Sequence, residues 1–327
     1  IRDALADGAT ELVLTGGEPT LRADLTQLIK TAKESGARRV VLETNGLMLA
    51  YPATVEALVA AGLDVVRIGL SAWDAASDAL SQRPGGFELT CRGVDNALAQ
   101  GLGVELSCAV QARNLGSVAA IPRQAIARFD RIDGFYLHLV TSAPGPFDAQ
   151  SIAPIDALLV AAQAMIDACR EVGLACHVCP QSALSPCWVR RRRQYPQLLR
   201  ALGHDAGDGH LRVPACATCA VADSCAGVKT DINKIAAALR PEAITARDTR
   251  FALAAGGDRR ASADQLLLSS GHFVDASGSV RDERVVRVNF HCNQDCTFCF
   301  VDRSLPAVGS ARVDAEIQRA SQDGVGL

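Results

Sequence analysis

ELVLTGGEP, residues 11–19, is a short apolar run that ends in two glycines, a glutamate and a proline. An apolar run of this length, bounded by glycine and proline, is typical of a buried strand. The two glycines leave the backbone open to close approach because no Cβ stands in the way, and the proline stops the strand. The stretch therefore predicts a buried strand whose carboxyl end carries a site.

The same pattern of a short apolar run followed by an amphipathic stretch recurs along residues 1–140. Strict alternation of strands and helices predicts βαβ units, a parallel sheet, and either a barrel or a doubly wound sheet. Functional residues then belong at the carboxyl ends of the strands. The predicted strands are Glu11–Thr15, Arg39–Glu43, Val65–Leu70, Val104–Val110 and Gly134–Val140, and the predicted helices lie near 23–36, 53–62, 88–101, 117–129 and 154–173.

The periodicity fails after about residue 175. Residues 175–230 are rich in cysteine, proline and arginine, and residues 240–285 are polar and predict a linker. A strand pattern follows at Arg284–Phe290, then a group of cysteines, then a helical pattern at Val313–Gln322. The end of that helix resembles the first eight residues of the chain, at a spacing of 316 residues when Ile317 is aligned with Ile1. This weak repeat suggests that the C-terminal segment begins a second copy of the N-terminal unit.

Length and composition limit the class of protein. A chain of 327 residues suggests about two domains. With 49% hydrophobic and 21% charged residues, a disordered chain is excluded, and no apolar run reaches the ~18 residues of a membrane span. A net charge of −3 provides no positive electrostatic field to attract nucleic acid. An aromatic content of 4% provides no surface on which bases could stack. We therefore expect a globular cytoplasmic protein that binds neither nucleic acid nor membrane.

Twelve cysteines in a long, core-rich chain are better explained as metal ligands than as a disulfide framework. Three of them, Cys91, Cys108 and Cys169, are scattered in apolar periodic segments and are predicted core residues, since free cysteine behaves as a small hydrophobe. The pair Cys176 and Cys179 ends an apolar run and is also predicted as core, with a role as metal ligands as the alternative.

The strongest chemical signal is a triad at Cys292, Cys296 and Cys299, on the loop that leaves the last predicted strand. Three thiolates at this spacing can hold three irons of a [4Fe–4S] cube and leave the fourth iron open to another ligand. The alternative is a zinc site, for which His291 could supply the fourth ligand.

A second cysteine group lies in the aperiodic segment. Cys216 and Cys219 are followed by Cys225 and preceded by Cys187, so four thiolates are available. Four thiolates can close either a [4Fe–4S] cluster or a tetrahedral zinc site, and the spacing does not separate the two.

Small polar residues recur at the ends of successive predicted strands. Thr44 and Asn45 end the second strand and Ser71 ends the third, as the glycine turn ends the first. A parallel barrel lines a site on one rim in this way.

The cysteine triad and the turn Gly16, Gly17, Glu18 and Pro19 resemble the two hallmark motifs of the radical S-adenosylmethionine superfamily. Residues 43–46 resemble its next strand end, and the likeness covers residues 1–140 and 284–327. It implies an α/β fold, a partial (β/α)6 barrel, here with a cysteine-rich extension. It also implies that Cys292, Cys296 and Cys299 ligate a [4Fe–4S] cluster.

The resemblance further implies roles for the strand ends. Gly16 to Pro19 would line the site of the methionine amino group of S-adenosylmethionine, and Thr44, Asn45 and Ser71 would contact the rest of that cofactor. The segment with Cys187, Cys216, Cys219 and Cys225 is similar to extensions that hold an auxiliary cluster, so iron–sulfur is preferred there over zinc.

The order of the motifs departs from the family, which places the triad shortly before the glycine turn, whereas here it follows by about 270 residues. Either the chain is permuted or it joins parts of two tandem units, and the weak repeat favours the tandem arrangement. The predicted domains are a barrel lacking its first strand at 1–174, a cysteine-rich extension at 175–239, a linker at 240–283, and the start of a second unit at 284–327.

The function implied by the resemblance is reductive cleavage of S-adenosylmethionine to a 5′-deoxyadenosyl radical that abstracts hydrogen from a substrate. The expected partners are a reductant such as a ferredoxin or flavodoxin and a substrate that is a peptide or a cofactor precursor. The alternative is a non-catalytic zinc or iron–sulfur module that presents a peptide or relays electrons to a partner enzyme.

Overall fold

A computed structural model gives the arrangement of the chain. It describes residues 11–140, 153–178, 210–211, 213–219, 228–229, 272–274, 280–297, 299 and 309–315.

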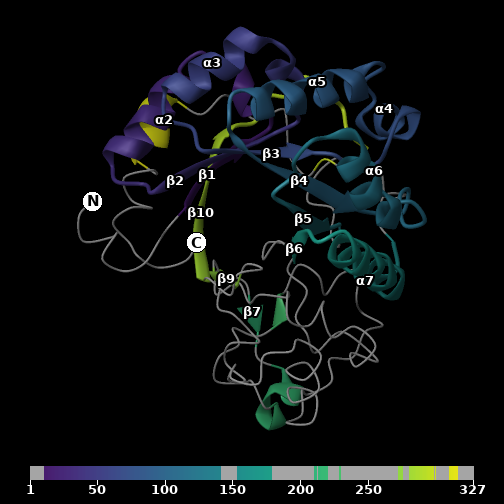
Figure 1. Cartoon of the computed structure of the whole chain (residues 1–327). Coiled ribbons are helices and arrows are strands. Elements are labelled where there is room, and N and C mark those ends of the chain that lie inside the picture. Colours follow the sequence, from purple (N-terminus) through teal and green to yellow (C-terminus); the bar gives the residue numbers. More distant parts are fainter. Residues whose placement is uncertain are drawn as a thin grey trace.

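One curved sheet organises the described residues (Figure 1). Its strand order is β6-β5-β4-β3-β2-β1-β10-β9, and every neighbouring pair from β6 to β10 is parallel, whereas β9 pairs with β10 in antiparallel fashion. A small antiparallel pair, β7 and β8, lies apart from this sheet. The strands are β1 (Glu11–Gly16), β2 (Arg39–Thr44), β3 (Val65–Gly69), β4 (Gly103–Val110), β5 (Gly134–Leu139), β6 (Ala175–Val178), β7 (His210–Leu211), β8 (Val228–Lys229), β9 (His272–Val274) and β10 (Val280–Asn289).

Helices follow the strands and lie on the outer face of the curved sheet (Figure 1). Their apolar stripes pack against the alternate strand residues that point outward, as in a β/α barrel. The α-helices are α2 (Leu25–Glu34), α3 (Pro52–Ala60), α4 (Ala75–Ser81), α5 (Gly86–Ala99), α6 (Ile121–Arg128) and α7 (Ile155–Glu171), and the 3-10 helices are η1 (Pro19–Leu21), η2 (Leu47–Ala50), η3 (Val118–Ala120) and η8 (Pro214–Thr218).

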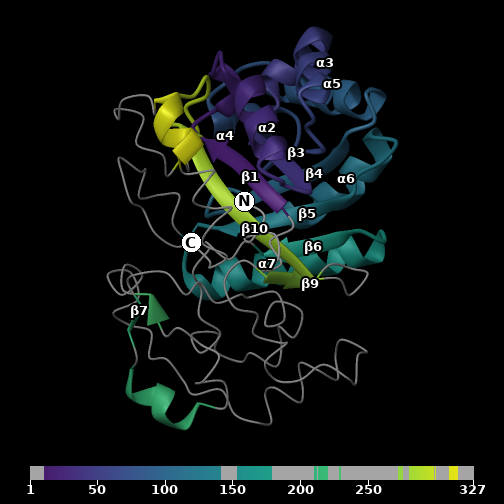
Figure 2. The ribbon, with the colours of Figure 1, turned by 90° about the vertical axis from the view of Figure 1, so that its left-hand side faces the viewer.

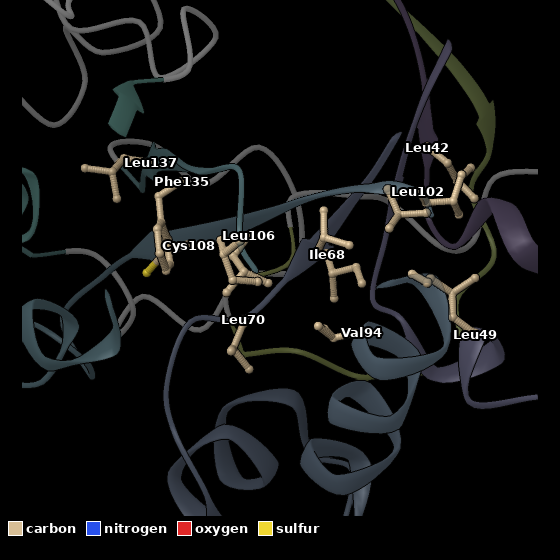
Figure 3. Packing of buried hydrophobic residues seen from close by; sticks show 14 of the residues in the cluster. Leu42, Leu49, Ile68, Leu70, Val94, Leu102, Leu106, Cys108, Phe135 and Leu137 are labelled. Atoms are coloured by element: carbon tan, nitrogen blue, oxygen red, sulfur yellow. The ribbon is translucent and has the colours of Figure 1, made fainter. Parts of the chain in front are cut away.

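The main core fills the space between the sheet and these helices (Figure 3). Leu42 and Ile68 from the strands and Leu49 and Val94 from η2 and α5 are buried there. The predicted core cysteines Cys91, Cys108 and Cys169 are buried in the same cluster, which confirms that prediction. A second cluster, Val13, Val41 and Val65, lies on the opposite, inner face of the sheet.

Contacts between strands that are not neighbours show that the sheet curves into a partial barrel. Glu43 on β2 and His138 on β5 approach within 3.3 Å, although β3 and β4 lie between their strands. Three strand spacings in a flat sheet measure about 14 Å. The two side chains can therefore meet only across the concave interior of a curved sheet. The predicted α/β fold is confirmed, and its curved sheet, with seven parallel strands where six were expected, is consistent with the predicted partial barrel.

The predicted strands and helices of residues 11–173 are present with shifts of a few residues at their ends. Helix α4 and strand β6 are among the elements that were not predicted. Helix α4 has only seven residues, most of them small, so it lacks a clear apolar stripe. Strand β6 has four residues, too few for a periodic signal.

Three findings bear on the predicted domains. Strand β6 pairs with β5, so the sheet continues past residue 174 to Val178. Strand β9 and the first residues of β10 lie within the range predicted as a linker. Strand β10 joins the sheet beside β1, where a first strand was predicted to be missing (Figure 2).

Within the described residues, no helix is both long and apolar enough to cross a bilayer.

Candidate functional site

The pairing of β10 with β1 places the cysteine loop beside the glycine turn. Thr15 is opposite Arg287 in the parallel register. Beyond the strand ends, the Gly17 N–H donates to the Asn289 carbonyl at 2.6 Å and the Glu18 N–H donates to the His291 carbonyl at 2.6 Å. Two motifs separated by about 270 residues in sequence thus share one edge of the sheet.

Both glycines of the turn are required by this close approach. A Cβ on Gly16 would lie 2.3 Å from the Asn289 carbonyl oxygen, and a Cβ on Gly17 would lie 2.3 Å from that of His291. The neighbouring atoms are backbone, which cannot swing aside as a side chain can. In the structure the space that the glycines leave open is filled by β10 and the start of the cysteine loop.

The C-terminal segment makes further contacts with the first unit. The Arg22 side chain donates to the Val288 carbonyl at 2.7 Å, and Ser310, in a short helix over 310–315, bonds to Asp24. The cysteine loop reaches α4, where the Asp295 and Thr297 N–H groups donate to the last carbonyls of that helix, at 3.2 and 3.0 Å. The C-terminal segment thus contacts the first unit before the cysteine loop, within it and after it.

The three cysteines of the triad are partly buried and lie close enough to influence one another. Burial raises the pKa of Cys296 to about 12, and the neighbouring Cys292 and Cys299 add to that shift. Burial also raises the pKa of Cys292, although hydrogen bonds from the Gln294 backbone and the Asn45 side chain oppose it. Thiols that resist ionisation when gathered together become stable as thiolates once a metal compensates their charge.

This donor set fits an iron–sulfur cluster. Three thiols on one short loop match the ligands of a [4Fe–4S] cube with an open iron. Within the described residues, no three His, Cys, Asp or Glu side chains are grouped closely enough to hold a single metal ion, the three cysteines of the triad included.

Glu18 links the ends of two neighbouring strands through hydrogen bonds. It is completely buried, and its carboxylate accepts from the Thr20 N–H at 3.0 Å, the Thr44 hydroxyl at 2.6 Å and the Asn45 N–H at 2.8 Å. Burial raises the pKa of Glu18, and these hydrogen bonds counteract the shift. The Pro19 that follows starts η1 and is buried. The carboxylate therefore joins the ends of β1 and β2 rather than facing a ligand.

The other predicted strand-end residues also form hydrogen bonds within the protein. The Thr44 hydroxyl donates to Glu18, and the Ser71 hydroxyl accepts from the Ala109 N–H at 2.9 Å. The Asn45 side chain points toward the cysteine loop, where it donates to Asn293 and Cys292. The structure thus brings Thr44 and Asn45 together with the triad, while Ser71 links the ends of β3 and β4.

The structure adds a set of charged residues that line the concave face. Arg67 forms an ion pair with Glu105 at 3.0 Å and lies over the Tyr136 ring at 3.4 Å. Glu43 and His138, each about a quarter exposed, pair across the interior at 3.3 Å. A signal for them was present in the sequence, because a charged residue at an inward position interrupts each otherwise apolar strand.

Gln111 was also missed by sequence reasoning. It directly follows β4 and is completely buried, and within the described part of the chain neither its side-chain nitrogen nor its side-chain oxygen has a hydrogen-bond partner. A buried amide without partners is costly and often indicates an absent ligand or water.

The second cysteine group lies largely outside the described residues. Cys187 and Cys225 are not described, whereas Cys216 and Cys219 lie in and directly after η8. The Val213 N–H donates to the Cys216 sulfur at 3.4 Å, and the Cys219 N–H donates to the Cys216 carbonyl. The backbone thus turns so that Cys219 returns to Cys216, and both cysteines are half-buried.

The pairing of Glu43 predicts a specific pH dependence of stability. Burial opposes its ionisation, but the hydrogen bond and charge of His138, the charge of Arg67 and the hydroxyl of Thr15 outweigh burial and lower the pKa of Glu43 from 4.5 to about 2. A lowered pKa stabilises the folded state above pH 4.5, and this stabilisation is lost as the pH falls toward 2.

We therefore expect Glu43→Gln to lower the free energy of unfolding at pH 7 by up to about 3 kcal/mol and to flatten its decrease between pH 4.5 and 2. Urea unfolding at a series of pH values measures both effects. An unchanged slope in the variant would contradict the assigned pairing.

Comparison with known proteins gives an independent line of evidence. Residues 1–110 match the family model described as the Radical SAM superfamily. The chain is 31% identical over 121 residues to Fe-coproporphyrin III synthase of Methanosarcina barkeri, covering 37% of this chain and 30% of the relative. It is 35% identical over 138 residues to a probable GTP 3′,8-cyclase of Halobacterium salinarum, covering 42% and 36%. A third relative, a probable GTP 3′,8-cyclase of Metallosphaera sedula, is 45% identical over 71 residues, 22% of each chain.

These relatives support the predicted resemblance over the N-terminal part of the chain. The chain spans about a third of the length of the first curated relatives it matches.

Proposed function

We propose that this chain, whose residues 1–110 carry a Radical SAM superfamily domain, is an iron–sulfur enzyme that reductively cleaves S-adenosylmethionine. The observation that carries the proposal is the docking of β10 on β1, which sets the cysteine triad beside the glycine turn. When bound, the [4Fe–4S] cluster would supply one electron to S-adenosylmethionine, whose 5′-deoxyadenosyl radical would then take a hydrogen atom from the substrate. A ferredoxin or flavodoxin is the proposed reductant.

Each part of the site has a proposed task. Cys292, Cys296 and Cys299 hold the cluster and leave one iron for the cofactor. The backbone of Gly16 to Pro19 lines the place of the methionine amino group, and its position is supported by the hydrogen bonds of Glu18. Thr44 and Ser71 keep the neighbouring strand ends at fixed distances from it.

The concave face is the proposed place of the substrate. Glu43 and His138 face the interior and keep part of their surface exposed, and Arg287 lies near Glu43. A substrate with hydrogen-bonding and charged groups suits this lining better than an apolar one. The curated relatives are named for porphyrin and nucleotide chemistry, and a polar cofactor precursor is the substrate class that we favour for this chain.

The assignment of the site to a single chain can be separated from an arrangement in which triad and turn meet between two copies of the chain. We expect that Cys296→Ala and Gly17→Ala proteins, each inactive, stay inactive when mixed in equal amounts, because triad and turn must come from one chain. The assay measures 5′-deoxyadenosine after anaerobic reconstitution of the mixture. Recovery toward a quarter of the wild-type rate would show that triad and turn are shared between copies.

We also propose that Cys187, Cys216, Cys219 and Cys225 hold an auxiliary [4Fe–4S] cluster, supported by the backbone hydrogen bond from Cys219, directly after η8, to Cys216 within it. Cys219→Ala is expected to lose half of the reconstituted iron and sulfide and to keep the half held by the triad. Iron and sulfide assays measure this loss. Zinc at equal amounts in the native protein, with iron unchanged by the substitution, would favour a zinc site instead.

A further inference from the structure

Asn45 contacts the cysteine loop with its side-chain amide. Its Nδ2 donates to Asn293 Oδ1 at 2.6 Å and to Cys292 Sγ at 3.7 Å. The residue lies directly after β2, 247 positions from Cys292 in sequence. The contact is therefore made by the fold and not by the local geometry of the loop.

The orientation of this amide is set by the groups around it. Asn45 Oδ1 accepts from the Leu47 N–H at 3.0 Å, and an amide turned by 180° would place two N–H donors face to face there. The nitrogen must consequently face Asn293 and Cys292, and its two hydrogens match two acceptors.

The backbone of Asn45 is held as firmly as its side chain. Its N–H donates to the Glu18 carboxylate at 2.8 Å and its carbonyl accepts from the Thr90 hydroxyl at 3.0 Å. Gly46 continues with φ of 79°, a left-handed conformation that glycine adopts without strain. An amide fixed on both sides is a preorganised donor, which does not have to reorganise when its acceptor gains charge.

We propose that Asn45 is a positioning residue for the cluster, in that its side chain donates an N–H···S hydrogen bond to the Cys292 thiolate and raises the reduction potential of the cluster. The inference rests on the proposed function, because it takes Cys292 as a cluster ligand. Hydrogen bonds to ligand sulfurs are among the factors that set the potentials of iron–sulfur clusters. Reduction adds negative charge to the cluster and its ligands, so a donor aimed at the sulfur stabilises the reduced state more than the oxidised one.

The test is an EPR-monitored redox titration of the reconstituted full chain without S-adenosylmethionine. The variant is Asn45→Ser, because a serine hydroxyl can still accept from the Leu47 N–H while the donor to Cys292 is lost. We expect reduction to become about tenfold less favourable, a shift of the midpoint potential by about 59 mV toward negative values for one electron.

The matched control is Asn293→Ala, which removes the other acceptor of the same amide and leaves the bond from Asn45 to Cys292. It also removes the 4.0 Å contact in which the Cys292 thiol donates to Asn293 Oδ1, a contact that needs the thiol proton and so is absent from a cluster-bound thiolate. Its midpoint potential is expected to equal that of the wild type. Equal shifts in both variants would mean that the loop had merely loosened, and no shift in Asn45→Ser would mean that the hydrogen bond does not act on the cluster. Either result overturns the inference.

If Asn45→Ser fails to take up iron, Asn293→Ala protein labelled with 15N-asparagine provides the measurement. A hyperfine coupling between the reduced cluster and an asparagine side-chain nitrogen is expected, and its absence overturns the inference. Failure of the proposed function looks different, because the protein would then hold no cluster, or would hold one and not cleave S-adenosylmethionine.

Discussion

Replacing Cys296 by alanine is expected to abolish formation of 5′-deoxyadenosine and to remove the cluster that the triad holds. The middle cysteine is partly buried and has the other two as neighbours. Loss of one of three thiolates leaves an iron without a protein ligand, and such a cluster is not retained. Iron analysis, the EPR spectrum after reduction, and chromatography of the products measure the effect.

The control for this substitution is Cys176→Ala. Cys176 packs against the main core on β6, far in sequence from the triad, and its pKa is raised by its hydrogen bond with Cys169 and by burial. We expect this variant to keep its cluster and its activity. Full activity of Cys296→Ala, or equal loss of iron in both variants, would contradict the assignment of the triad.

The second large effect is expected for Gly17→Ala. The new Cβ would lie 2.3 Å from the His291 carbonyl oxygen and 2.5 Å from that of Phe290, so β10 must move away from β1. The hydrogen bonds from the Gly17 and Glu18 N–H groups would then be lost, which costs about 2 kcal/mol and lowers the equilibrium constant for docking of the C-terminal segment about thirtyfold. Most of the bound iron should be lost with it.

Hydrogen exchange of the β10 amides, with iron content, measures this loss of docking. Gly116→Ala is the matched control, because a Cβ there meets nothing within 4 Å. We expect faster exchange in residues 286–289 of Gly17→Ala and unchanged exchange in the control. Equal protection of β10 in the two variants would show that the turn does not hold the C-terminal segment.

The strands and helices of residues 11–173 follow from sequence because their apolar patterns are long and regular. Each strand buries its outward residues under a helix, as Leu42 and Ile68 do, and the alternation of elements permits few topologies. The cysteine triad and the glycine turn were likewise recognisable, since three thiols and two glycines in short runs have few structural explanations.

The position of the C-terminal segment was harder to predict. Local patterns identify Arg284–Phe290 as a strand, but they do not say which edge it joins. That choice depends on Gly16 and Gly17. Because they have no side chains, the backbone of a neighbouring strand can pack against them at close distance. The tandem arrangement favoured by the weak repeat remains a proposal.

The roles of single polar residues also depended on the structure. Asn45 and Glu18 were expected to serve the cofactor, yet their hydrogen bonds go to the cysteine loop and to neighbouring strand ends. Glu43 and His138 meet across the barrel interior, and no spacing in the sequence indicates a contact between strands that are not neighbours.

The central claim is that triad and glycine turn form one site that binds S-adenosylmethionine at an open iron. The most direct measurement is the EPR spectrum of the reduced, reconstituted chain before and after addition of S-adenosylmethionine, followed by assay for 5′-deoxyadenosine. We predict that addition changes the cluster signal and that 5′-deoxyadenosine forms, and that Gly17→Ala protein still holding iron shows neither. A wild-type cluster signal that S-adenosylmethionine leaves unchanged, with no 5′-deoxyadenosine, would contradict the account.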